Sequence, residues 1–131
     1  MRIRHQSENT EQIVALAVEA MESVKGKEIA TLDLREIGTS VTDYFVICHA
    51  NSKTQVDAIA DKVIDHVFEG AKAKPYHIEG RDNTEWILID FVDVVVHVFL
   101  RSARSFYKLE ELWADADRKR RRRLNVSKTI H

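Results

Sequence analysis

Histidine and cysteine come first among the residues that could do chemistry, because imidazole and thiolate groups hold zinc in many proteins. Cys48 and His49 are adjacent, whereas His66, His77 and His97 are scattered along the chain. No two of these histidines stand four positions apart, and the sequence has neither a CxxC nor an HExxH motif. We therefore predict no metal site and no cofactor. The histidines are interpreted as surface or strand residues, with His97 kept as a residue that could serve recognition.

A nucleophilic enzyme would need an activated serine or cysteine beside a base. Cys48 lies within an apolar stretch that is typical of a buried strand, where a thiol is usually inert. Ser40 and Ser52 are accounted for by a turn and by the start of a helix. The sequence therefore gives no support to covalent catalysis.

Phosphoryl transfer assisted by metal ions would need two carboxylates close together, typically as Asp-x-Asp at a strand end after a Gly-Ser turn. The Gly-Thr-Ser segment at 38–40 faintly resembles such a turn, but the next carboxylate, Asp43, has no second one two positions on. Asp90 and Asp93 stand three positions apart across an expected turn. Because the nucleotide-binding motifs GxxxxGK[ST] and GxGxxG are also absent, we predict that the protein is not an enzyme.

The spacing of apolar residues predicts the elements that must carry these side chains. Three- and four-residue steps indicate helices at about 9–25, 52–70 and 102–115. Asn9 with Gln12, and Ser52 with Gln55, are expected capping pairs, and Gly26 is expected to end the first helix. Alternating or continuous apolar runs indicate strands at 28–34, 43–48, 76–79, 86–91 and 93–100.

The order of these elements, α-β-β-α-β-β-β-α, predicts an α/β fold, a two-layer domain with a mixed sheet of about five strands and three helices. Only Val92 separates the last two strands, which therefore form either a tight hairpin or one long bent strand. A hairpin is favoured, because residues 90–93 provide the four positions of a reversal.

The last two strands have two different faces. One face is purely apolar and is the natural floor for the helices; it carries Ile87, Ile89, Phe91, Val94, Val96, Val98 and Leu100. The other is mixed and carries Trp86, Leu88, Asp90, Asp93, Val95, His97 and Phe99. An acidic neighbour, Asp90 or Asp93, is expected to orient the ring of His97. Such a face either meets a partner or is covered by the helix at 102–115, and strand alternation does not decide between the two.

The composition describes one domain with an acidic body and a basic tail. The 131 residues are 44% hydrophobic and 31% charged, which is typical of a soluble globular chain with a single core. Residues 118–131 carry seven basic and no acidic side chains, so residues 1–117 hold 13 basic and 21 acidic ones and a net charge of −8. We expect residues 1–117 to form the domain and residues 118–131 a mobile tail. A body of this sign favours a basic protein partner over nucleic acid, whereas the tail could contact a polyanion.

The cellular location is predicted from three features of the sequence. A single cysteine suits a reducing compartment, no apolar run reaches the roughly 18 residues of a membrane span, and the N-terminal residues lack an apolar signal segment. We therefore expect a cytoplasmic protein without a membrane partner.

Short motifs in a fixed order connect the sequence with a known family. They are DYFVI at 43–47, NSKTQV at 51–56, AIAD at 58–61, EG at 79–80, WILID at 86–90, DVVVHVF at 93–99 and ARSFYKLEELW at 103–113. In these motifs and their spacing, the chain resembles the Iojap-like ribosomal silencing factors (RsfS) of bacteria and organelles over about residues 9–115. Two features depart from that family's pattern. Val92 replaces a glycine that the family commonly has, and the arginine-rich tail has no counterpart that we can match.

The resemblance implies a nucleotidyltransferase-like α/β domain that lacks the catalytic carboxylates. It implies a translational repressor that binds the large ribosomal subunit through ribosomal protein L-fourteen and blocks joining of the small subunit. A role in late assembly of the large subunit is also implied, and similar proteins are often homodimers. The alternative is a nucleotide-processing enzyme of the same fold, which turnover of nucleotides with a divalent metal would reveal.

The mixed strand face and the resemblance together predict the partner-binding residues. The expected contact surface is Trp86, Leu88, Asp90, Asp93, Val95, His97 and Phe99, with Glu79 and Arg81 at its rim. Trp86 is the expected anchor, because buried aromatic residues dominate such interfaces. Asp90 and Asp93 are expected to meet lysine or arginine on the partner and to steer association. The basic tail is expected to add contacts with rRNA without choosing the site. The turn at Val92 is expected to avoid positive φ, which a β-branched residue disfavours.

Overall fold

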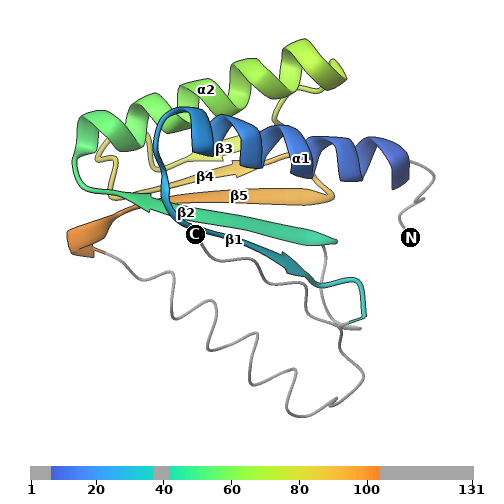
Figure 1. The fold of residues 1–131 in the computed structure, drawn as a ribbon, viewed down its shortest axis with the longest axis horizontal. Helices are drawn as coiled ribbons and strands as arrows, with labels where there is room; N and C mark the ends of the chain where they lie inside the picture. The colour runs from blue at the N-terminus through green and yellow to red at the C-terminus, as the bar shows by residue number, and fades with distance from the viewer. Residues whose placement is uncertain (1–6, 37–41, 104–131) are drawn as a thin grey trace.

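The protein has two helices and five strands within the residues that the structure, a computed structural model, describes: 7–36 and 42–103 (Figure 1). The helices are α1 (Ser7–Ser23) and α2 (Lys53–Ala71), and a short 3-10 helix, η1 (Arg101–Ala103), follows the last strand. The strands are β1 (Lys27–Asp33), β2 (Tyr44–Ala50), β3 (His77–Glu79), β4 (Trp86–Asp90) and β5 (Val94–Leu100). Each lies within two residues of its predicted bounds. Most of the third expected helix, at 102–115, and the basic tail lie outside the described residues.

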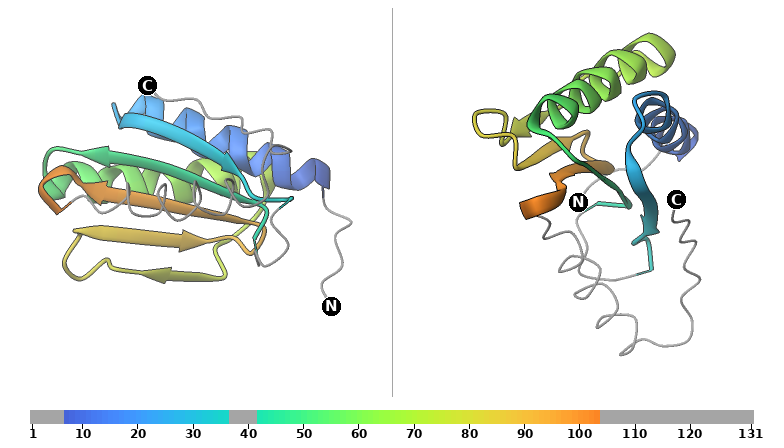
Figure 2. Two further views of the ribbon diagram at one scale, coloured as in Figure 1. Left: turned by 90° about the horizontal axis from the view of Figure 1, so that it is seen from below. Right: turned by 60° about the vertical axis from the view of Figure 1, so that its left-hand side comes forward.

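The five strands form one mixed sheet in the order β1-β2-β5-β4-β3. Within the described sheet only β2 and β5 run parallel, and the other three pairs are antiparallel. Both helices lie on one face of the sheet (Figures 1 and 2). This is the two-layer α/β arrangement that the sequence predicts, with two helices in the described part instead of three. No helix in that part is long and apolar enough to cross a membrane.

The core lies between the two helices and the purely apolar strand face. On the strand side Ile87, Ile89, Val94, Val96 and Val98 are fully buried, as predicted. The helix side consists of apolar residues of both helices, namely Val56, Ile59, Ala60, Val63 and Val67 of α2 with Ile13, Ala17, Ala20 and Met21 of α1. Full burial of a large aliphatic side chain contributes about 1.5–3 kcal/mol. Burial on this scale fixes which face of each strand turns toward the helices.

One glutamine ties the start of α2 to the end of α1. Ser52 caps α2, as predicted, by accepting a hydrogen bond from the amide of Gln55 at 3.1 Å. The side-chain amide of Gln55 donates to the carbonyl oxygens of Val24 at 3.0 Å and of Lys25 at 3.2 Å. Carbonyls beyond the last turn of a helix have no partner within it. The Gln55 side chain therefore binds carbonyl groups at the end of α1 and does not complete the predicted capping pair at the start of α2.

The start of α1 differs from the prediction. The helix begins at Ser7, so that Asn9 and Gln12 lie inside it and do not cap it. The Gln12 side chain instead donates to the carbonyl oxygen of Gly70 on α2 at 3.0 Å. Gln12, predicted to be part of a cap, thus connects the two helices.

The end of α1 also differs in detail. Lys25, not Gly26, takes the left-handed conformation, with φ of 62°. The amide of Gly26 then donates to the carbonyl oxygen of Met21 at 2.8 Å, which closes the helix end. Gly26 is crowded instead, because a Cβ there would lie 3.1 Å from the Sγ of Cys48.

The last two strands form the favoured hairpin, but its turn was predicted wrongly. Val92 has φ of 80°, in the region that we expected a β-branched residue to avoid. The amide of Asp93 donates to the carbonyl oxygen of Phe91 at 3.0 Å, which closes a three-residue γ-turn around Val92. The Val92 amide donates to the Asp90 carboxylate at 2.7 Å, and the Phe91 amide donates to the carbonyl oxygen of Val94 at 2.8 Å. These hydrogen bonds hold Val92 in an unfavourable conformation.

Replacing Val92 with glycine is expected to stabilise the protein. Glycine reaches positive φ without the penalty of a branched side chain, and Val92 is 43% exposed, so little packing is lost. We expect the free energy of unfolding to rise by about 1 kcal/mol in urea denaturation. Val92→Ala is the control, because it removes the branching but keeps a Cβ, and it should give only part of the gain. A Val92→Gly protein no more stable than the parent would contradict the argument.

Candidate functional site

The second face of the sheet points away from α1 and α2, and we call it the distal face. Its β4 and β5 residues lie opposite one another in the register Trp86–Phe99, Leu88–His97 and Asp90–Val95. Glu79 of β3 continues the face beside Leu88. The strands β4 and β5, with the edge strand β3, thus bring together seven of the nine residues predicted to bind a partner.

Among the described residues of this face, Trp86 is the large hydrophobic residue that stays accessible, with 41% of its surface exposed. Its Nε1–H donates to Nδ1 of His97 at 3.1 Å. The centroid of its ring lies 5.0 Å from that of Phe99 and 5.9 Å from that of His97. The indole is therefore held in one orientation by a hydrogen bond and by ring contacts, while much of it stays accessible.

His97 is buried, with 3% of its surface exposed. Its ring packs edge-on against Phe45, with centroids 4.7 Å apart, and lies parallel to the ring of Phe99 at 6.2 Å. Burial lowers the pKa of His97 to about 3, so the ring is neutral near pH 7. A neutral ring that accepts at Nδ1 carries its proton on Nε2, and no group among the described residues pairs with Nε2. The prediction that Asp90 or Asp93 orients this ring was wrong, because its polar partner is the indole of Trp86.

His97 should make the stability of the protein depend on pH below neutrality. The unfolded chain takes up a proton at His97 near pH 6.5, whereas the folded chain does so only near pH 3. Because the unfolded state binds more protons between these values, the free energy of unfolding should fall by roughly 1.4 kcal/mol per pH unit below about 6.5. Urea denaturation of the parent and of His97→Phe between about pH 5 and 7 measures this. The charged groups nearest along this face, Glu79 and Asp90, are present in both proteins, so equal pH slopes would contradict the assignment.

The two aspartates predicted as contacts lie on different sides of the sheet. Asp90 is partly buried on the distal face, where its Oδ1 accepts from the amide of Val92 at 2.7 Å. Asp93 precedes β5, and its Oδ2 accepts from Oγ1 of Thr10 on α1 at 3.3 Å. Its carbonyl oxygen accepts from the amide of Asp43 at 2.9 Å. The structure therefore keeps Asp90 with Trp86 but does not bring Asp93 to the distal face.

The two residues predicted at the rim also separate. Arg81 donates to Oδ1 of Asp57 at 2.6 Å and of Asp61 at 2.7 Å, both on α2. The hydrogen bond to Asp61, together with the charges of both carboxylates, raises the pKa of Arg81. Glu79 is exposed, and its Oε2 lies 2.7 Å from Nε2 of His77. The rim of the distal face is therefore formed by Glu79 with His77, whereas Arg81 belongs to the helical layer.

Burial divides the predicted set into two groups. Trp86, Leu88, Asp90 and Val95 keep accessible surface, whereas His97 and Phe99 are buried. Phe99 belongs to a second buried cluster with Leu32, Leu34 and Ile47, against which Phe45 packs. β1 and β2 thus contribute to this face, which was not predicted from the sequence. Alternation along DYFVIC, which places Phe45 and Ile47 on one side, was the available signal.

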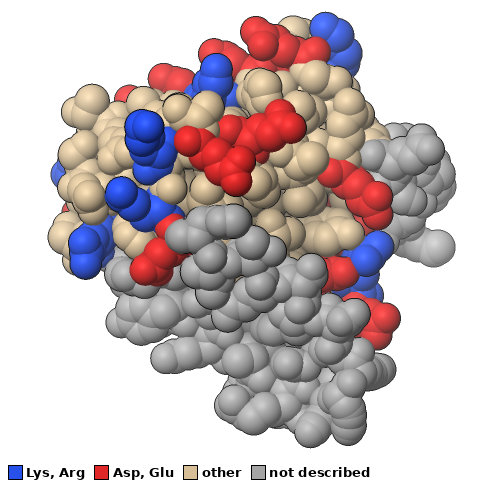
Figure 3. Space-filling view, in the orientation of Figure 1, with Lys and Arg blue, Asp and Glu red and all other residues tan. Residues whose placement is uncertain are grey.

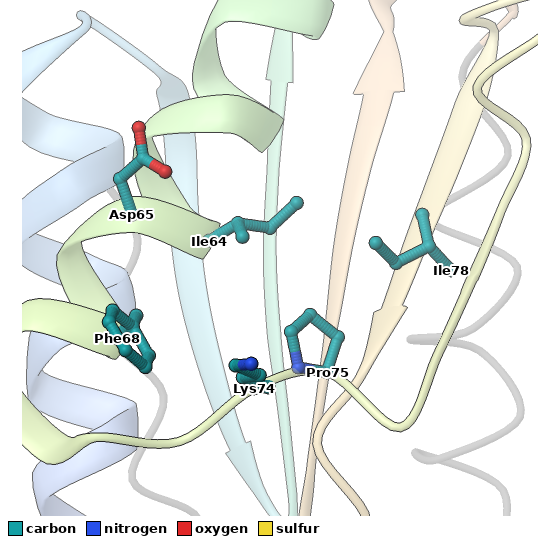
Figure 4. A pocket seen from close by; sticks show the side chains of 6 residues that line it. All are labelled: Ile64, Asp65, Phe68, Lys74, Pro75 and Ile78. Carbon is teal, nitrogen blue, oxygen red and sulfur yellow. The ribbon is translucent and has the colours of Figure 1, made fainter.

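A groove of about 470 Å³ lies on another part of the molecule, between α2 and the segment leading into β3 (Figure 4). It is lined by Ile64, Asp65, Phe68, Lys74, Pro75 and Ile78. Phe68 is 42% exposed, and the Nζ atoms of Lys72 and Lys74 lie 5.4 and 5.8 Å from its ring centroid. In the part of the chain that the structure describes, no group of three or more His, Cys, Asp or Glu residues could hold a metal ion.

Acidic side chains are prominent on the helical side of the molecule. Figure 3 shows several of them spread over the visible face, with most of the lysine and arginine side chains toward the left and a few at the right. Asp61, Asp65 and Glu69 of α2 are exposed, and Asp57 is partly buried. Since Arg81 pairs with Asp57 and Asp61, it neutralises part of this acidic surface.

Comparison with known proteins gives one consistent result. The profile of a family described as "Ribosomal silencing factor during starvation" matches residues 7–130. This match includes the arginine-rich segment at 118–123, which we could not relate to the family from its motifs. The chain is 44% identical over 109 residues to ribosomal silencing factor RsfS of Bacillus subtilis, covering 82% of this chain and 90% of that protein.

The chain is also similar to a mitochondrial protein and to a protein of known crystal structure. The chain is 37% identical over 76 residues to "Mitochondrial assembly of ribosomal large subunit protein 1" of Mus musculus, covering 55% of this chain and 32% of that protein. A crystal structure of a Chromobacterium violaceum protein matches with a TM-score of 0.72 and 33% identity, covering 89% of this chain and 91% of that one. The fold described above is thus shared with an experimentally determined structure.

Proposed function

We propose, since this chain belongs to the RsfS family of ribosomal silencing factors, that it represses translation by occupying the large ribosomal subunit. The finer parts of the proposal are that its partner there is ribosomal protein L-fourteen and that the bound protein sterically blocks joining of the small subunit. The family description, which names silencing during starvation, supports repression of translation. The name of the mouse relative, which refers to assembly of the large subunit, supports an additional role in late assembly.

The accessible indole of Trp86 is the observation that carries the proposal. Protein interfaces concentrate their binding energy in a few aromatic or arginine residues that become buried on association. Trp86 is 41% exposed yet held by His97 and Phe99, so little ordering is required when it binds. Leu88 and Val95 provide partly buried apolar surface on the same face. This combination supports a protein-binding surface centred on Trp86.

The charge of the domain supports a basic partner. Residues 1–117 have a net charge of −8, which attracts a basic protein surface and repels phosphate. Asp90 and Glu79 place carboxylates on the distal face and at its rim. Charges at a rim act mostly on the association rate. Reversal of Asp90 and Glu79 to lysine is therefore expected to slow binding more than it speeds dissociation.

Binding without catalysis is part of the proposal, and so is a nucleotidyltransferase-like origin of the fold. A mixed five-stranded sheet with both described helices on one face supports that origin. The alternative is a nucleotide-processing enzyme. One carboxylate that such an enzyme could use, that of Asp90, accepts from the amide of Val92 and so has a structural role. Incubation with nucleotides and a divalent metal tests the alternative, and turnover abolished by Asp43→Asn or Asp90→Asn would establish it.

Sedimentation with purified ribosomal subunits tests the main proposal. The protein should sediment with large subunits alone and should reduce the yield of joined ribosomes when it is added before small subunits. Isolated L-fourteen should compete for the protein in the same experiment. Protein that sediments equally with both subunits, or that leaves joining unchanged, would contradict occlusion.

The proposal also includes action in the cytoplasm and a homodimeric state. In a bacterium, the ribosomal subunits join in the cytoplasm. Light scattering after size-exclusion chromatography tests whether the protein is a homodimer. A mass of one chain at concentrations that suffice for ribosome binding would show that dimerisation is not needed.

Deleting the basic tail, residues 118–131, is expected to reduce the salt dependence of binding to large subunits. Seven positive charges can neutralise rRNA phosphates, and each such contact steepens the slope of log affinity against log salt concentration by about 0.7–0.9. We expect a shallower slope but unchanged affinity for isolated L-fourteen. An unchanged slope would leave the tail without an rRNA contact, and weaker binding to L-fourteen would place part of the protein interface in the tail.

A further inference from the structure

We infer that His97 is a positioning residue for partner binding, which acts by accepting a hydrogen bond from the indole of Trp86. This inference rests on the proposed function, because Trp86 is the anchor it concerns. His97 is 3% exposed and is not itself available to a partner, so its effect is transmitted through the tryptophan. The two residues are not an opposed pair in the sheet, since Trp86 pairs with Phe99 and His97 pairs with Leu88.

The geometry gives His97 a specific role in orienting the indole. An indole that lies on a sheet through apolar contacts alone can turn about its side-chain bonds with little loss of buried area. The hydrogen bond from Nε1 of Trp86 to Nδ1 of His97, at 3.1 Å, fixes one edge of the indole. The ring of Phe99 packs against the indole, with the two centroids 5.0 Å apart. The His97 ring is in turn held between Phe45 and Phe99. Since Phe45 and Phe99 fix the ring that accepts the hydrogen bond, the orientation of Trp86 is set before any partner arrives.

The second ring nitrogen of His97 indicates that stability alone does not explain this histidine. With Nδ1 accepting, Nε2 carries the proton, and no described group accepts from it. A buried donor without an acceptor destabilises the folded state. Replacing the ring with phenylalanine would remove that donor and keep the aromatic contacts with Phe45 and Phe99. A purely structural role therefore predicts that His97→Phe lowers neither stability nor affinity. A positioning role predicts that the variant folds normally but binds large subunits more weakly.

Two substitutions separate the acceptor from the ring. His97→Phe keeps a ring but removes the acceptor. His97→Asn removes the ring but keeps an oxygen close to the position of Nδ1, so it can still accept from the indole. Each is made in the full-length chain, alone and together with Trp86→Phe, which removes the indole N–H. Affinity for purified large subunits is the binding measurement. The indole N–H resonance of Trp86, assigned by its absence in Trp86→Phe, reports the hydrogen bond, and urea denaturation reports stability.

We expect His97→Phe to weaken binding to large subunits about 10-fold, the equivalent of one hydrogen bond, with unchanged or greater resistance to urea. Its Trp86 N–H resonance should move to the position of a water-exposed indole. His97→Asn should restore affinity to within about 3-fold of the parent and restore the resonance. In the Trp86→Phe background, His97→Phe should have no further effect on affinity, because the donor is already absent.

The outcomes separate this inference from the proposed function. If Trp86→Ala abolishes binding but His97→Phe binds like the parent, the positioning role is wrong and the proposed surface stands. If Trp86→Ala leaves binding unchanged, the proposed surface itself is wrong. An effect of His97→Phe that persists undiminished in the Trp86→Phe background would overturn the inference, and this comparison decides the matter if His97→Asn does not fold.

Discussion

Replacing Trp86 with alanine is expected to weaken binding to the large ribosomal subunit by about 30-fold or more, the equivalent of about 2 kcal/mol. Trp86 is the accessible anchor of the distal face, and truncation removes both its contact area and the orientation that His97 gives it. Stability should change less than affinity, because 41% of the side chain is already exposed in the free protein. Affinity for purified large subunits and urea denaturation measure the two effects.

Tyr76→Ala is the matched control for this substitution. Tyr76 is also a large aromatic residue, and it is 79% exposed, but it precedes β3 and lies apart from Trp86 in the sheet. Its removal should leave affinity within about 2-fold of the parent. A Trp86→Ala protein that remains folded and binds like the Tyr76 variant would show that the distal face is not the interface.

Gly80→Ala is expected to destabilise the protein by about 2–4 kcal/mol. Gly80 has φ of 90°, a conformation that strongly favours glycine, and a Cβ at this position would overlap the carbonyl oxygen of Trp86. The obstacle is backbone rather than the end of a flexible side chain, so the loop and the start of β4 must separate. Because β4 starts at Trp86, the same separation should also weaken binding to large subunits.

Gly70→Ala provides the control for the added methyl group. Its Cβ would lie 2.8 Å from the Cδ atoms of Leu16, which end a flexible side chain, and its backbone has no positive φ. The higher helix propensity of alanine, worth about 1 kcal/mol, offsets part of this crowding. Urea midpoints of the two variants make the comparison, and equal midpoints would show that the Gly80 turn tolerates a side chain.

The elements of this fold could be predicted because their signals are local. The alternation of Ile87 and Ile89, and of Val94, Val96 and Val98, determines which side of each strand is buried, whatever the rest of the chain does. Ser52 and Gln55 are three residues apart, so the cap of α2 can also be predicted from a short segment of the sequence. The grouping of Trp86, Leu88 and Asp90 on one face follows from the same alternation.

The directions of two charged side chains, Arg81 and Asp93, could not be predicted, because their partners lie far away in the sequence. Arg81 turns to the helical layer because Asp61 is 20 residues away in the chain but adjacent in space. Asp93 turns toward α1 through Thr10, which is 83 residues away. Nothing near Arg81 or Asp93 in the sequence indicates which layer supplies the partner. Both were assigned to the binding surface from strand alternation together with the family resemblance, and alternation does not hold in the turns where they lie.

The positive φ of Val92 could not be predicted for a related reason. Propensity alone disfavours it, and only the closing of the hairpin by Asp90 and Asp93 forces it. The burial of His97 has a similar origin. Alternation along β5 places Phe99 beside the His97 ring, but the depth of burial also depends on Phe45, which the parallel pairing of β2 with β5 brings to that ring.

The parallel pairing of β2 with β5 has a consequence for synthesis of the chain. Tyr44 pairs with Val94, so the centre of the sheet joins segments separated by 50 positions, whereas β3, β4 and β5 follow one another closely. Contacts of long sequence separation require loop closure before they contribute, and they slow folding. During translation β1, β2 and both helices are made before β5, so β2 has an unpaired inner edge next to apolar residues for that interval. Unpaired edges of this kind promote aggregation. The nascent protein therefore cannot complete its core until about residue 100 has left the ribosome.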